Sequence, residues 1–574
     1  MAKLEDKYKK ENLQNHIYNT PDTYVGGCDL IAEILPLYDS EKKKIEFKET
    51  EFIPALYNTF NEILVNAKDQ VTRLEELYKK DKTIQRISEI KVEIKSEKGE
   101  VSIYNDGDGI DVAEHPKEKK NGKPIYIPQL IFGELLTSTN YNKEEQKVVG
   151  GKNGYGAKLT NIFSQTFKIE TVDRIRKKKY TQLFRGNMKI ISKPKITDYS
   201  GKPYTKITWT ADFDRFGIDK YSKDMINLMI RRVYDIAGIT DKSVNVYLNK
   251  KKLSVKSFLD YSKMYLNEEP IIYEEILDNG IPWKIGVSLS DSDKFEQISF
   301  VNGIANPKGG KHVDMITKQL TAGLKKLIVK KTKKDINENY IKNYLRVFLD
   351  CLIVNPSFDS QTKERLITTP SKFGSKPVLT EKFLKNIISK TELLNKVLLF
   401  SEFKMSKENK KTDGTKRNKI RDIPKLDDAN NAGTKKSDLC TLILTEGDSA
   451  KTMAISGLSK VGRDNYGVFP LKGKVLNVRD ASSEQILKNA EITNLKKILG
   501  LETGKEYKNT KSLRYGKIMI MTDQDHDGSH IKGLVMNVFH YLWPSLIKIG
   551  YITSMITPIV KVTLKKKTKS FYTL

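Results

Sequence analysis

The sequence predicts an α/β protein, with both α/β and α+β domains, and three observations support this prediction. In Lys517–Leu534 a short apolar run is followed by an acidic turn and then by apolar residues at helical spacing. Residues 56–77 carry apolar side chains along one side of a helix, and the segment 90–103 alternates as a β-hairpin does. A chain of 574 residues is long enough for about three to four domains.

The charge balance of the chain favours a polyanionic partner. The 101 basic residues exceed the 72 acidic ones, which gives a net charge of +29. Such an excess favours nucleic acid first and an anionic membrane second, although a lysine-rich proteome would give the same balance. No apolar run approaches the roughly 18 residues of a membrane span, and the N-terminus lacks signal-peptide features. Cys28, Cys351 and Cys440 lie far apart, which indicates a reducing compartment and no metal-spaced pair.

The acidic turn after the strand at 518–521 is the first candidate site. Asp523, Asp525 and Asp527 follow this strand at alternate positions, at the edge of an α/β sheet where ligands bind. Three carboxylates so close together repel and raise one another's pKa. A divalent cation relieves that repulsion, and Mg²⁺ favours a few carboxylates together with phosphate oxygens. A solvated acidic loop and a calcium loop are the alternatives, but the glutamate that ends a calcium loop is missing.

A second predicted strand ends in the same way. The apolar run Cys440–Leu444 leads into Glu446, and Gly447 permits a tight turn. Both turns resemble the acidic motifs of the Rossmann-like TOPRIM fold, and here they read TEGDSA and DQDHDG. The flanking stretches 461–482 and 513–534 resemble eukaryotic-type DNA topoisomerase II, a type IIA enzyme. The resemblance implies that Mg²⁺ for DNA strand transfer is held by Glu446, Asp523, Asp525 and Asp527.

The helix predicted at 56–77 carries another candidate site. Glu62, Asn66 and Asp69 fall at i, i+4 and i+7 and share its polar face, which taken alone would be a solvated surface. The hairpin that follows leads into the turn YNDGDGI, and later come GELLTSTNY and VVGGKNGYGAKL. A helix with ExxxN, an N-x-G-x-G turn and a glycine-rich lid resemble the GHKL (Bergerat) ATPase sandwich. The amino-acid sequences of these segments are similar to those of topoisomerase II in particular.

The resemblance implies a nucleotide site with a role for each group. Glu62 would act as general base for the water that attacks the γ-phosphate, Asn66 would bind the nucleotide's Mg²⁺, and Asn105 would accept from the adenine amine. Glycines let backbone N–H groups approach phosphates. The other contacts to ATP would come from Ser138, Thr139, Asn140, Gly150, Gly151, Lys152, Asn153, Gly154, Tyr155, Gly156, Ala157 and Lys158. Tyr8 either reaches the partner subunit's nucleotide or is an ordinary surface tyrosine, and Asn61 stands where the family usually has aspartate.

Further along, the chain resembles the transducer domain of that family, which is of the ribosomal S5-like type. The resemblance lies in Phe295–Asp314 and in the segment FDSQTKERL, where Gln361 and Lys363 match a loop that contacts the γ-phosphate. A lysine that reaches this phosphate from a second domain would couple hydrolysis to rigid-body movement. The basic run 325–334 is either a solvated helix end or a DNA-facing surface. In the second case, contacts to DNA phosphates would come from Lys330, Lys331, Lys333 and Lys334.

These stretches divide the chain into four expected parts. They are a GHKL ATPase domain with an N-terminal strap at 1–250, a transducer domain at 251–400, a lysine-rich linker or hinge at 401–437, and a TOPRIM domain at 438–574. The family's winged-helix domain, with the tyrosine that attacks DNA, has no counterpart in the sequence. Tyr515 is no substitute, because it directly precedes the TOPRIM strand. Either the sequence is part of a longer chain, which we favour, or it is a natural subunit whose partner supplies that domain.

The function expected from the resemblance is the ATP-hydrolysing gate and Mg²⁺-binding TOPRIM part of a type II DNA topoisomerase. The chain alone is expected to hydrolyse ATP without cleaving DNA. It would form a homodimer through its ATPase domains when ATP is bound, act on duplex DNA, and reside in the nucleus or in a viral compartment that contains DNA. The alternative is a standalone ATP-driven clamp that binds duplex DNA without cleaving it. The other motifs disfavour a TOPRIM nuclease or primase and a GHKL chaperone.

Overall fold

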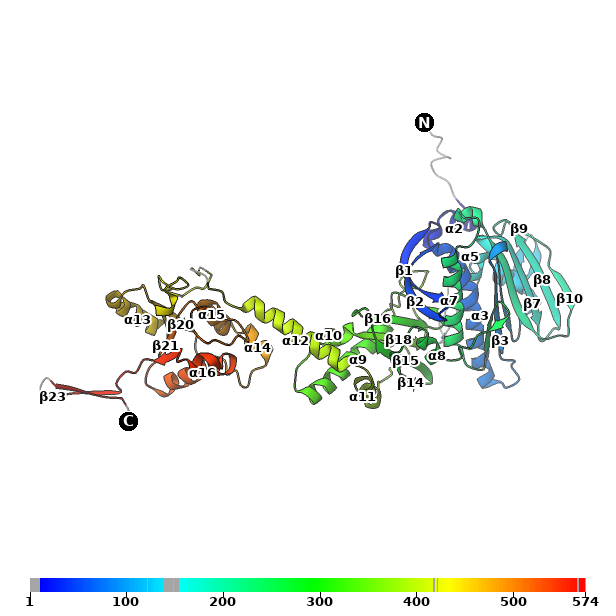
Figure 1. Cartoon of the computed structure of the whole chain (residues 1–574). Helices are drawn as coiled ribbons and strands as arrows, with labels where there is room; N and C mark the ends of the chain where they lie inside the picture. Colours follow the sequence, from blue (N-terminus) through cyan, green and yellow to red (C-terminus); the bar gives the residue numbers. More distant parts are fainter. Residues whose placement is uncertain are drawn as a thin grey trace, which may run out of the picture. The chain divides into compact units, whose positions relative to one another are not determined.

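The computed structural model describes residues 11–120, 122–137, 148, 154–416, 419–420, 422–564 and 567–572. The chain divides into two units, Met1–Val397 and Leu398–Leu574, and Figure 1 colours them along the sequence. Both units combine helices with sheets, which confirms the predicted α/β class. None of the helices within these ranges is long and apolar enough to span a membrane.

A large mixed sheet forms the centre of the N-terminal part of the first unit. Its strands run in the order β10-β8-β7-β11-β4-β3-β12-β13, with β9 beside β8, and β12 runs parallel to β3. The alternation predicted at 90–103 is confirmed as the hairpin β3–β4, which turns through left-handed Gly99 (φ 61°). The strands are β3 (Glu89–Lys95), β4 (Glu100–Asp106), β7 (Ser164–Asp173), β8 (Lys178–Arg185), β9 (Ile190–Ile191), β10 (Lys195–Asp198), β11 (Tyr204–Ala211), β12 (Asn245–Leu248) and β13 (Lys251–Lys252).

The long helix α3 (Pro54–Lys80) packs on this sheet and carries the polar face noted in the sequence. Its first residue is proline, which suits a helix start because a backbone N–H has no intrahelical partner there. Leu56, Phe60 and Leu64 recur at helical spacing and are buried. Burial of such side chains contributes roughly 1.5–3 kcal/mol each. The helix predicted at 56–77 is thus confirmed, and it extends slightly beyond both predicted ends.

A second long helix, α7 (Lys223–Ile239), contacts α3, the hairpin β1–β2 and strand β12 (Figure 1). Its buried face includes Arg231, Arg232 and Asp235 among apolar side chains. The shorter elements around these helices are α2 (Leu13–Asn19), β1 (Ile31–Asp39), β2 (Lys44–Phe52), β5 (Glu114–Lys120), β6 (Lys123–Tyr126), α4 (Ile127–Gly133), α5 (Gly156–Ile162), α6 (Phe213–Phe216) and α8 (Phe258–Lys263).

A smaller sheet follows in the same unit, in the order β14-β15-β18-β16-β17. Its middle strand β18 is buried along its whole length, and Trp283 of the neighbouring β15 is fully buried. Helices α10 and α11 pack against α9, and α11 also contacts β14. The elements are β14 (Ile272–Asp278), β15 (Ile281–Leu289), β16 (Glu296–Val301), β17 (Ile304–Ala305), α9 (Lys311–Thr332), α10 (Glu338–Asn343), β18 (Leu345–Cys351) and α11 (Glu381–Lys390).

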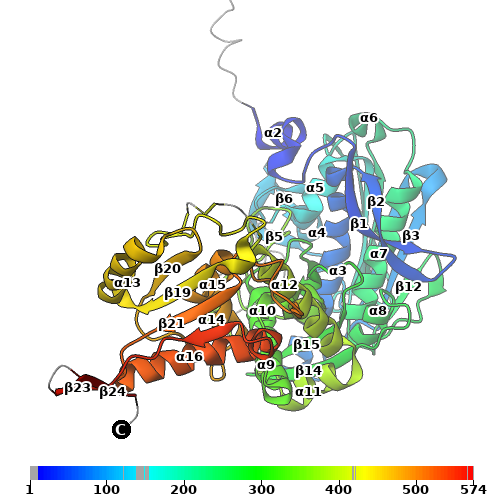
Figure 2. The same ribbon diagram turned by 60° about the vertical axis from the view of Figure 1, so that its left-hand side comes forward.

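A parallel sheet in the order β20-β19-β21-β22 forms the core of the second unit, and Figure 2 shows β19, β20 and β21 side by side. The strands predicted at 440–444 and 518–521 are confirmed as its neighbouring strands β19 and β21. Leu442 and Leu444 pack with residues of α15 and α16, whereas Ile443 packs with residues of α13. Because helices cover both faces, these strands are apolar along their length, and their carboxyl ends meet at one edge.

The elements of the second unit are β19 (Thr441–Glu446), α13 (Gly447–Val461), β20 (Tyr466–Leu471), α14 (Ser483–Lys488), α15 (Ala490–Leu499), β21 (Lys517–Met521), α16 (His526–Leu542), α17 (Pro544–Lys548), β22 (Ile552–Ser554), β23 (Val560–Leu564) and β24 (Lys567–Phe571). Strands β23 and β24 pair with each other as an antiparallel hairpin.

The stretch expected as a linker is partly helical and partly packed on the parallel sheet. Its first residues belong to helix α12 (Leu393–Thr412). Closer to β19, Asp428 accepts hydrogen bonds from Arg514 and Tyr515, and Ala432 beside it is fully buried. The buried guanidinium of Arg514 thereby receives a counter-charge, which a buried cation requires. The stretch that leads into β19 is therefore anchored to the second unit.

Buried His312 on α9 makes the stability of the first unit sensitive to acid. Neither of its ring nitrogens has a hydrogen-bond partner within the described residues, and burial lowers its pKa from 6.5 to about 3. Below pH 6.5 the unfolded chain therefore takes up a proton that the folded unit does not. The folded unit consequently loses stability as the pH falls from 6.5 toward 3.

We expect His312→Leu to remove this part of the acid sensitivity. Between about pH 7.5 and about pH 5.5 the wild-type chain should lose about 1 kcal/mol more unfolding free energy than the variant, because one titrating group differs between them. Urea unfolding at both pH values measures the difference. His16→Gln, at an exposed position of the same unit, should behave as wild type. Equal acid sensitivity of wild type and His312→Leu would contradict the prediction.

Candidate functional site

A cavity of about 680 Å³ in the first unit collects the predicted nucleotide-site residues that the structure describes. One wall is the polar face of α3, where Glu62, Asn66 and Asp69 line the cavity at the helical spacing noted in the sequence. Arg73 lines it one turn further on and was not identified from the sequence. The sequence feature that could have identified Arg73 is its position on the same helical face, at i+11 from Glu62.

The floor of the cavity is formed where strand β4 ends. Asn105 lines the cavity, and its side-chain Nδ2 donates to the backbone oxygen of Asp106 at 2.8 Å. Asp106 itself does not line the cavity and is buried. Burial opposes its ionisation, but Lys202 at 2.7 Å and hydrogen bonds from Ser88 and the backbone outweigh burial, so the pKa of Asp106 lies below its usual value. The buried carboxylate of Asp106, paired with the half-exposed Lys202, holds the turn that presents Asn105.

The start of helix α5 closes another side of the cavity. Gly154, Tyr155, Gly156, Ala157 and Lys158 all line it. A Cβ at Gly156 would lie 2.2 Å from Glu62 Oε2, so only glycine lets α5 approach the carboxylate this closely.

Lys158 lines the cavity but is engaged with the backbone. Its Nζ donates to the carbonyl oxygens of Thr137 at 2.7 Å and Gly154 at 2.8 Å. Burial lowers the pKa of Lys158 to about 8. In the structure its ammonium therefore ties Thr137 to Gly154, a role that the sequence did not indicate.

Several predicted ATP contacts lie outside the described residues. They are Tyr8, Ser138, Thr139, Asn140, Gly150, Gly151, Lys152 and Asn153. Their roles stay predictions.

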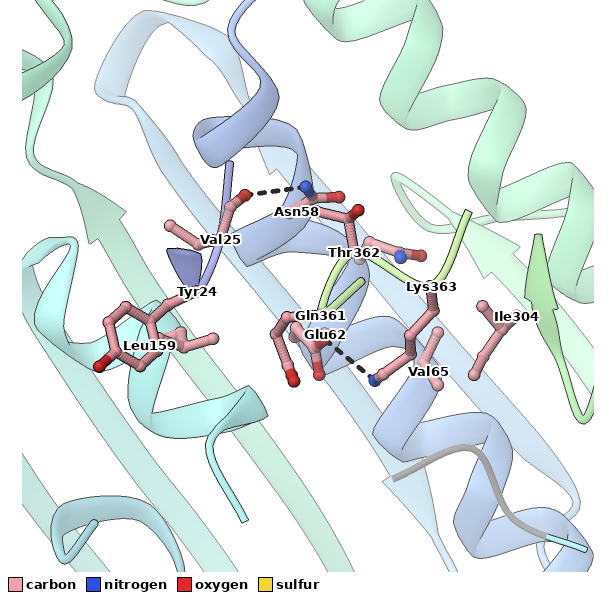
Figure 3. Close-up of a pocket in the computed structure, with 11 residues that line it drawn as sticks. Tyr24, Val25, Asn58, Glu62, Val65, Leu159, Ile304, Gln361, Thr362 and Lys363 are labelled. Atoms are coloured by element: carbon pink, nitrogen blue, oxygen red, sulfur yellow. Dashed lines mark hydrogen bonds and ion pairs between the residues drawn. The ribbon is translucent and has the colours of Figure 1, made fainter. Parts of the chain in front are cut away.

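A loop that follows β18 brings Lys363 to the same cavity. Its Nζ lies 3.3 Å from Glu62 Oε1, although the two residues are 301 positions apart in the sequence. Both side chains are largely shielded, with 12% of Lys363 and 15% of Glu62 exposed. Gln361 lines the cavity on the same loop, and Figure 3 shows the ion pair reaching from this loop to α3. The structure thus brings together the carboxylate and the lysine that the sequence placed in separate domains.

The Lys363 loop is held in place by the segment between β16 and α9. Lys363 adopts a left-handed backbone (φ 61°), which is uncommon for a residue with a side chain. Its carbonyl oxygen accepts from Asn306 Nδ2 at 2.8 Å. The backbone N–H of Leu366 donates to Gly309 at 3.1 Å, and that of Lys308 donates to Glu364 at 3.2 Å. The left-handed conformation is therefore stabilised by bonds at Lys363 and at the residues that follow it.

The predicted carboxylates of the second unit meet at the edge where β19 and β21 end. Glu446 ends β19, and Asp523, Asp525 and Asp527 follow β21. Burial raises the pKa of Glu446, and repulsion from Asp525, Asp523 and Asp527 raises it further. Asp525 Oδ1 accepts from the backbone N–H of Gly528 at 2.7 Å and so caps helix α16.

The fit of this edge to a metal ion rests on Glu446. Its Oε2 is buried and has no hydrogen-bond partner among the described residues, which is costly for a carboxylate and suits a cation ligand. Asp527 lies 3.2 Å from Lys474 in an exposed ion pair. As they stand, no three His, Cys, Asp or Glu side chains in the described ranges are arranged to hold a metal ion. The donor set therefore fits Mg²⁺ in chemistry, while its side chains would need to reorient.

The predicted DNA-binding lysines lie at the C-terminal end of α9. Lys330 and Lys331 belong to its last turn, left-handed Lys333 caps it, and Lys334 follows. All four side chains are exposed, as contacts to DNA phosphates require and as a solvated helix end would also show.

Comparison with known proteins assigns a family to this arrangement. Two family models match the chain, DNA gyrase B over residues 244–417 and the Toprim domain over residues 441–555. The crystal structure of the ATPase region of Saccharomyces cerevisiae topoisomerase II matches with a TM-score of 0.63 at 39% identity, over 70% of this chain and 100% of that chain. This chain belongs to the DNA topoisomerase II family. The predicted GHKL ATPase, transducer and TOPRIM folds are thereby confirmed.

Full-length topoisomerase II chains of animals extend well beyond this sequence. DNA topoisomerase 2 of Drosophila melanogaster is 46% identical over 583 residues, and DNA topoisomerase 2-alpha of Homo sapiens is 46% identical over 585 residues. Each alignment covers 100% of this chain but only 39% and 37% of the two relatives, respectively. The predicted resemblance to eukaryotic topoisomerase II is confirmed over the whole sequence, which spans a little over a third of those relatives' length.

In this member of the family, Gly528 has no room for a side chain. A Cβ there would lie 2.1 Å from the backbone oxygen of Asp523, in the acidic turn. We expect Gly528→Ala to displace the turn and to destabilise the second unit by about 1–3 kcal/mol, as overpacking does. Scanning calorimetry should show the transition of this unit several degrees lower.

Gly533→Ala, on the same helix α16, is the matched control. Nothing lies within 4 Å of its Cβ, so alanine should leave stability unchanged or raise it by up to about 1 kcal/mol. Equal transition temperatures of the two variants would contradict the assigned close approach at Gly528.

Proposed function

We propose that this chain is the ATP-hydrolysing gate and the Mg²⁺-binding TOPRIM part of a type II DNA topoisomerase, which passes one duplex through a double-strand break in another. The observation that supports this most is the convergence of Glu62 and Lys363, 301 positions apart, on the cavity that Asn66 and Asn105 also line. A carboxylate and a lysine in one cavity supply a base for water and a cation for a phosphate.

Each group at the cavity has a role in this proposal. Glu62 orients the attacking water and accepts its proton. Asn66, one turn further along α3, offers its amide oxygen to Mg²⁺, which neutralises charge on the phosphates when bound. Asn105 presents its acceptor oxygen to the adenine amine, since its Nδ2 already bonds the backbone. Backbone N–H groups from Gly154 to Lys158, and the predicted contacts outside the described residues, hold ribose and phosphates.

Lys363 links the cavity to the transducer. In the structure its ammonium pairs with Glu62, and a γ-phosphate that enters the cavity competes for the same ammonium. Once Lys363 binds the phosphate, Glu62 is free to accept the proton of water. When the phosphate leaves, the pair with Glu62 forms again and the loop moves with it. Hydrolysis thereby drives a rigid-body shift of the transducer. Gln361 provides a second contact to the phosphate from the same loop.

At the second site, Mg²⁺ would be held by Glu446, Asp523, Asp525 and Asp527. The metal supplies a Lewis acid and clamp for strand transfer when bound. The unpartnered Oε2 of Glu446 supports this assignment. Tyr515 is unsuited to attack DNA, because it is buried and its hydroxyl bonds Asp428. The attacking tyrosine would come from a winged-helix portion of the full-length chain or of a partner subunit.

The proposed partners and cellular setting follow from the proposed topoisomerase function. Duplex DNA would contact the exposed lysines at the end of α9, and ATP would join two copies through their ATPase domains, with Tyr8 reaching across. The family supports a nuclear or viral setting, and domain boundaries near 250, 400 and 437 are proposed. A standalone ATP-driven clamp would leave the acidic edge without a role, so the topoisomerase is favoured.

The test is the ATPase rate measured against protein concentration, with and without duplex DNA. We expect the rate to rise with both. Glu62→Gln should lower it by at least about 100-fold, the usual contribution of a general base. Glu75→Gln is the control, because Glu75 lies on the same helix but pairs with Arg86 at the surface. A rate indifferent to concentration, to DNA and to Glu62→Gln would contradict the proposal.

A further inference from the structure

A buried arginine joins the two segments that carry the Glu62–Lys363 pair. Arg232 of α7 is completely buried. Its Nε donates to Asn61 Oδ1 at 2.7 Å, its Nη2 donates to the backbone oxygen of Gly303 at 2.7 Å, and its Nη1 lies 3.3 Å from Asp235 Oδ2. Hydrogen bonds from a charged donor are shorter and stronger than neutral ones. This guanidinium therefore fixes three separate segments relative to one another.

On one side, Arg232 holds the helix that carries the base. Asn61 directly precedes Glu62 on α3. Asn61 and Glu62 both line a small second cavity, together with Lys363 and Ile304. A bond that fixes the side chain of Asn61 also fixes the turn of α3 from which Glu62 reaches Lys363.

On the other side, Arg232 holds the turn that leads to Lys363. Gly303 lies between β16 and β17, and the two-residue strand β17 runs directly into Asn306. Asn306 donates to the Lys363 carbonyl at 2.8 Å. The turn is stiff, because Asn302 exchanges two hydrogen bonds with the backbone of Ile353, at 2.9 and 2.7 Å. The position of Gly303 is thus transmitted to Lys363 through a short, bonded path.

We propose that Arg232 is a positioning residue that sets the spacing between Glu62 and Lys363, and so couples the ATPase helix to the transducer loop. This inference rests on the proposed function. Arg232 touches neither nucleotide nor water in this account and acts only through Asn61 and Gly303. Its loss should therefore affect the chemical step more than nucleotide binding, because Asn66 and Asn105 keep their places.

The neighbouring Arg231 offers a matched control. It is also buried on α7 and bonds the same carboxylate, Asp235, at 2.7 Å. Its other bond goes to the Tyr57 hydroxyl at 3.1 Å, one turn of α3 away from Asn61. Replacing either arginine removes a buried charge beside Asp235, but only Arg232 joins Asn61 to Gly303. A purely structural role would make the two replacements equivalent.

The experiment compares kcat and KM for ATP hydrolysis in Arg232→Met and Arg231→Met. We expect Arg232→Met to lower kcat by about 10- to 100-fold, the scale of a small misplacement at a reacting centre. KM for ATP should stay within about twofold of the wild-type value. A residue that only positions Glu62 and Lys363 does not change how tightly ATP binds. For Arg231→Met, kcat per folded molecule should stay within about threefold of the wild-type value. Equal kcat losses in both variants, or an unchanged kcat in Arg232→Met, would overturn the proposal.

A milder pair of variants keeps the test decisive if Arg232→Met does not fold. Asn61→Ala removes only the acceptor on α3 and should lower kcat by about 10-fold, whereas Asn61→Asp restores an acceptor and should stay within about threefold of wild type. Equal kcat values for Asn61→Ala and wild type would overturn the proposal. The wild type and Glu62→Gln are measured in parallel. A wild-type chain without ATPase activity refutes the proposed function itself, whereas an active wild type with normal Arg232 and Asn61 variants refutes only the positioning role.

Discussion

The ion pair between Glu62 and Lys363 is the contact on which the proposed site of the first unit depends. Two charges that are this well shielded have lost much of their hydration, and an ion pair offsets that cost only when its geometry is held closely. The geometry comes from the large sheet behind α3, from the smaller sheet behind the Lys363 loop, and from Arg232 between them. Because desolvation takes up much of what such a pair gains, an anionic ligand can compete for its lysine.

In the second unit, like charges lie together instead of opposite ones. There, parallel strands bring like charges together at one edge, and burial with mutual repulsion raises the pKa of Glu446. Asp525 is partly satisfied as the cap of α16, and Asp527 pairs with Lys474. Glu446 keeps an unpartnered buried oxygen among the described residues. The first unit thus holds a paired carboxylate and ammonium, and the second holds unbalanced negative charge that suits a divalent metal.

Local periodicity predicted much of the fold, because burial of one helix face or strand face leaves a pattern in neighbouring residues. The helix at 56–77, the hairpin at 90–103 and the strands at 440–444 and 518–521 are all present in the structure. The same spacing indicated the polar face of α3, and extending it by one turn would have included Arg73.

Contacts between distant segments left no such pattern. The Lys363 loop was recognised only through resemblance, and its bond to Asn306 depends on the packing of β16, β17 and β18. Nothing local marks Arg232 as different from Arg231, although their partners differ. The backbone bonds of Lys158 likewise follow from how α5 meets Thr137. Such partners are set by tertiary packing, which the spacing of residues along one element does not encode.

The central claim is that Glu62 and Lys363 act as one unit, and a double-mutant cycle on single-turnover ATP hydrolysis tests it most directly. The rates of Glu62→Gln, Lys363→Met and the double variant are compared, with nucleotide affinity measured alongside. If the pair acts as a unit, the double variant should be no slower than the worse single variant, since effects of coupled groups are strongly non-additive. Losses that multiply, or a Lys363→Met variant as fast as wild type, would contradict the account.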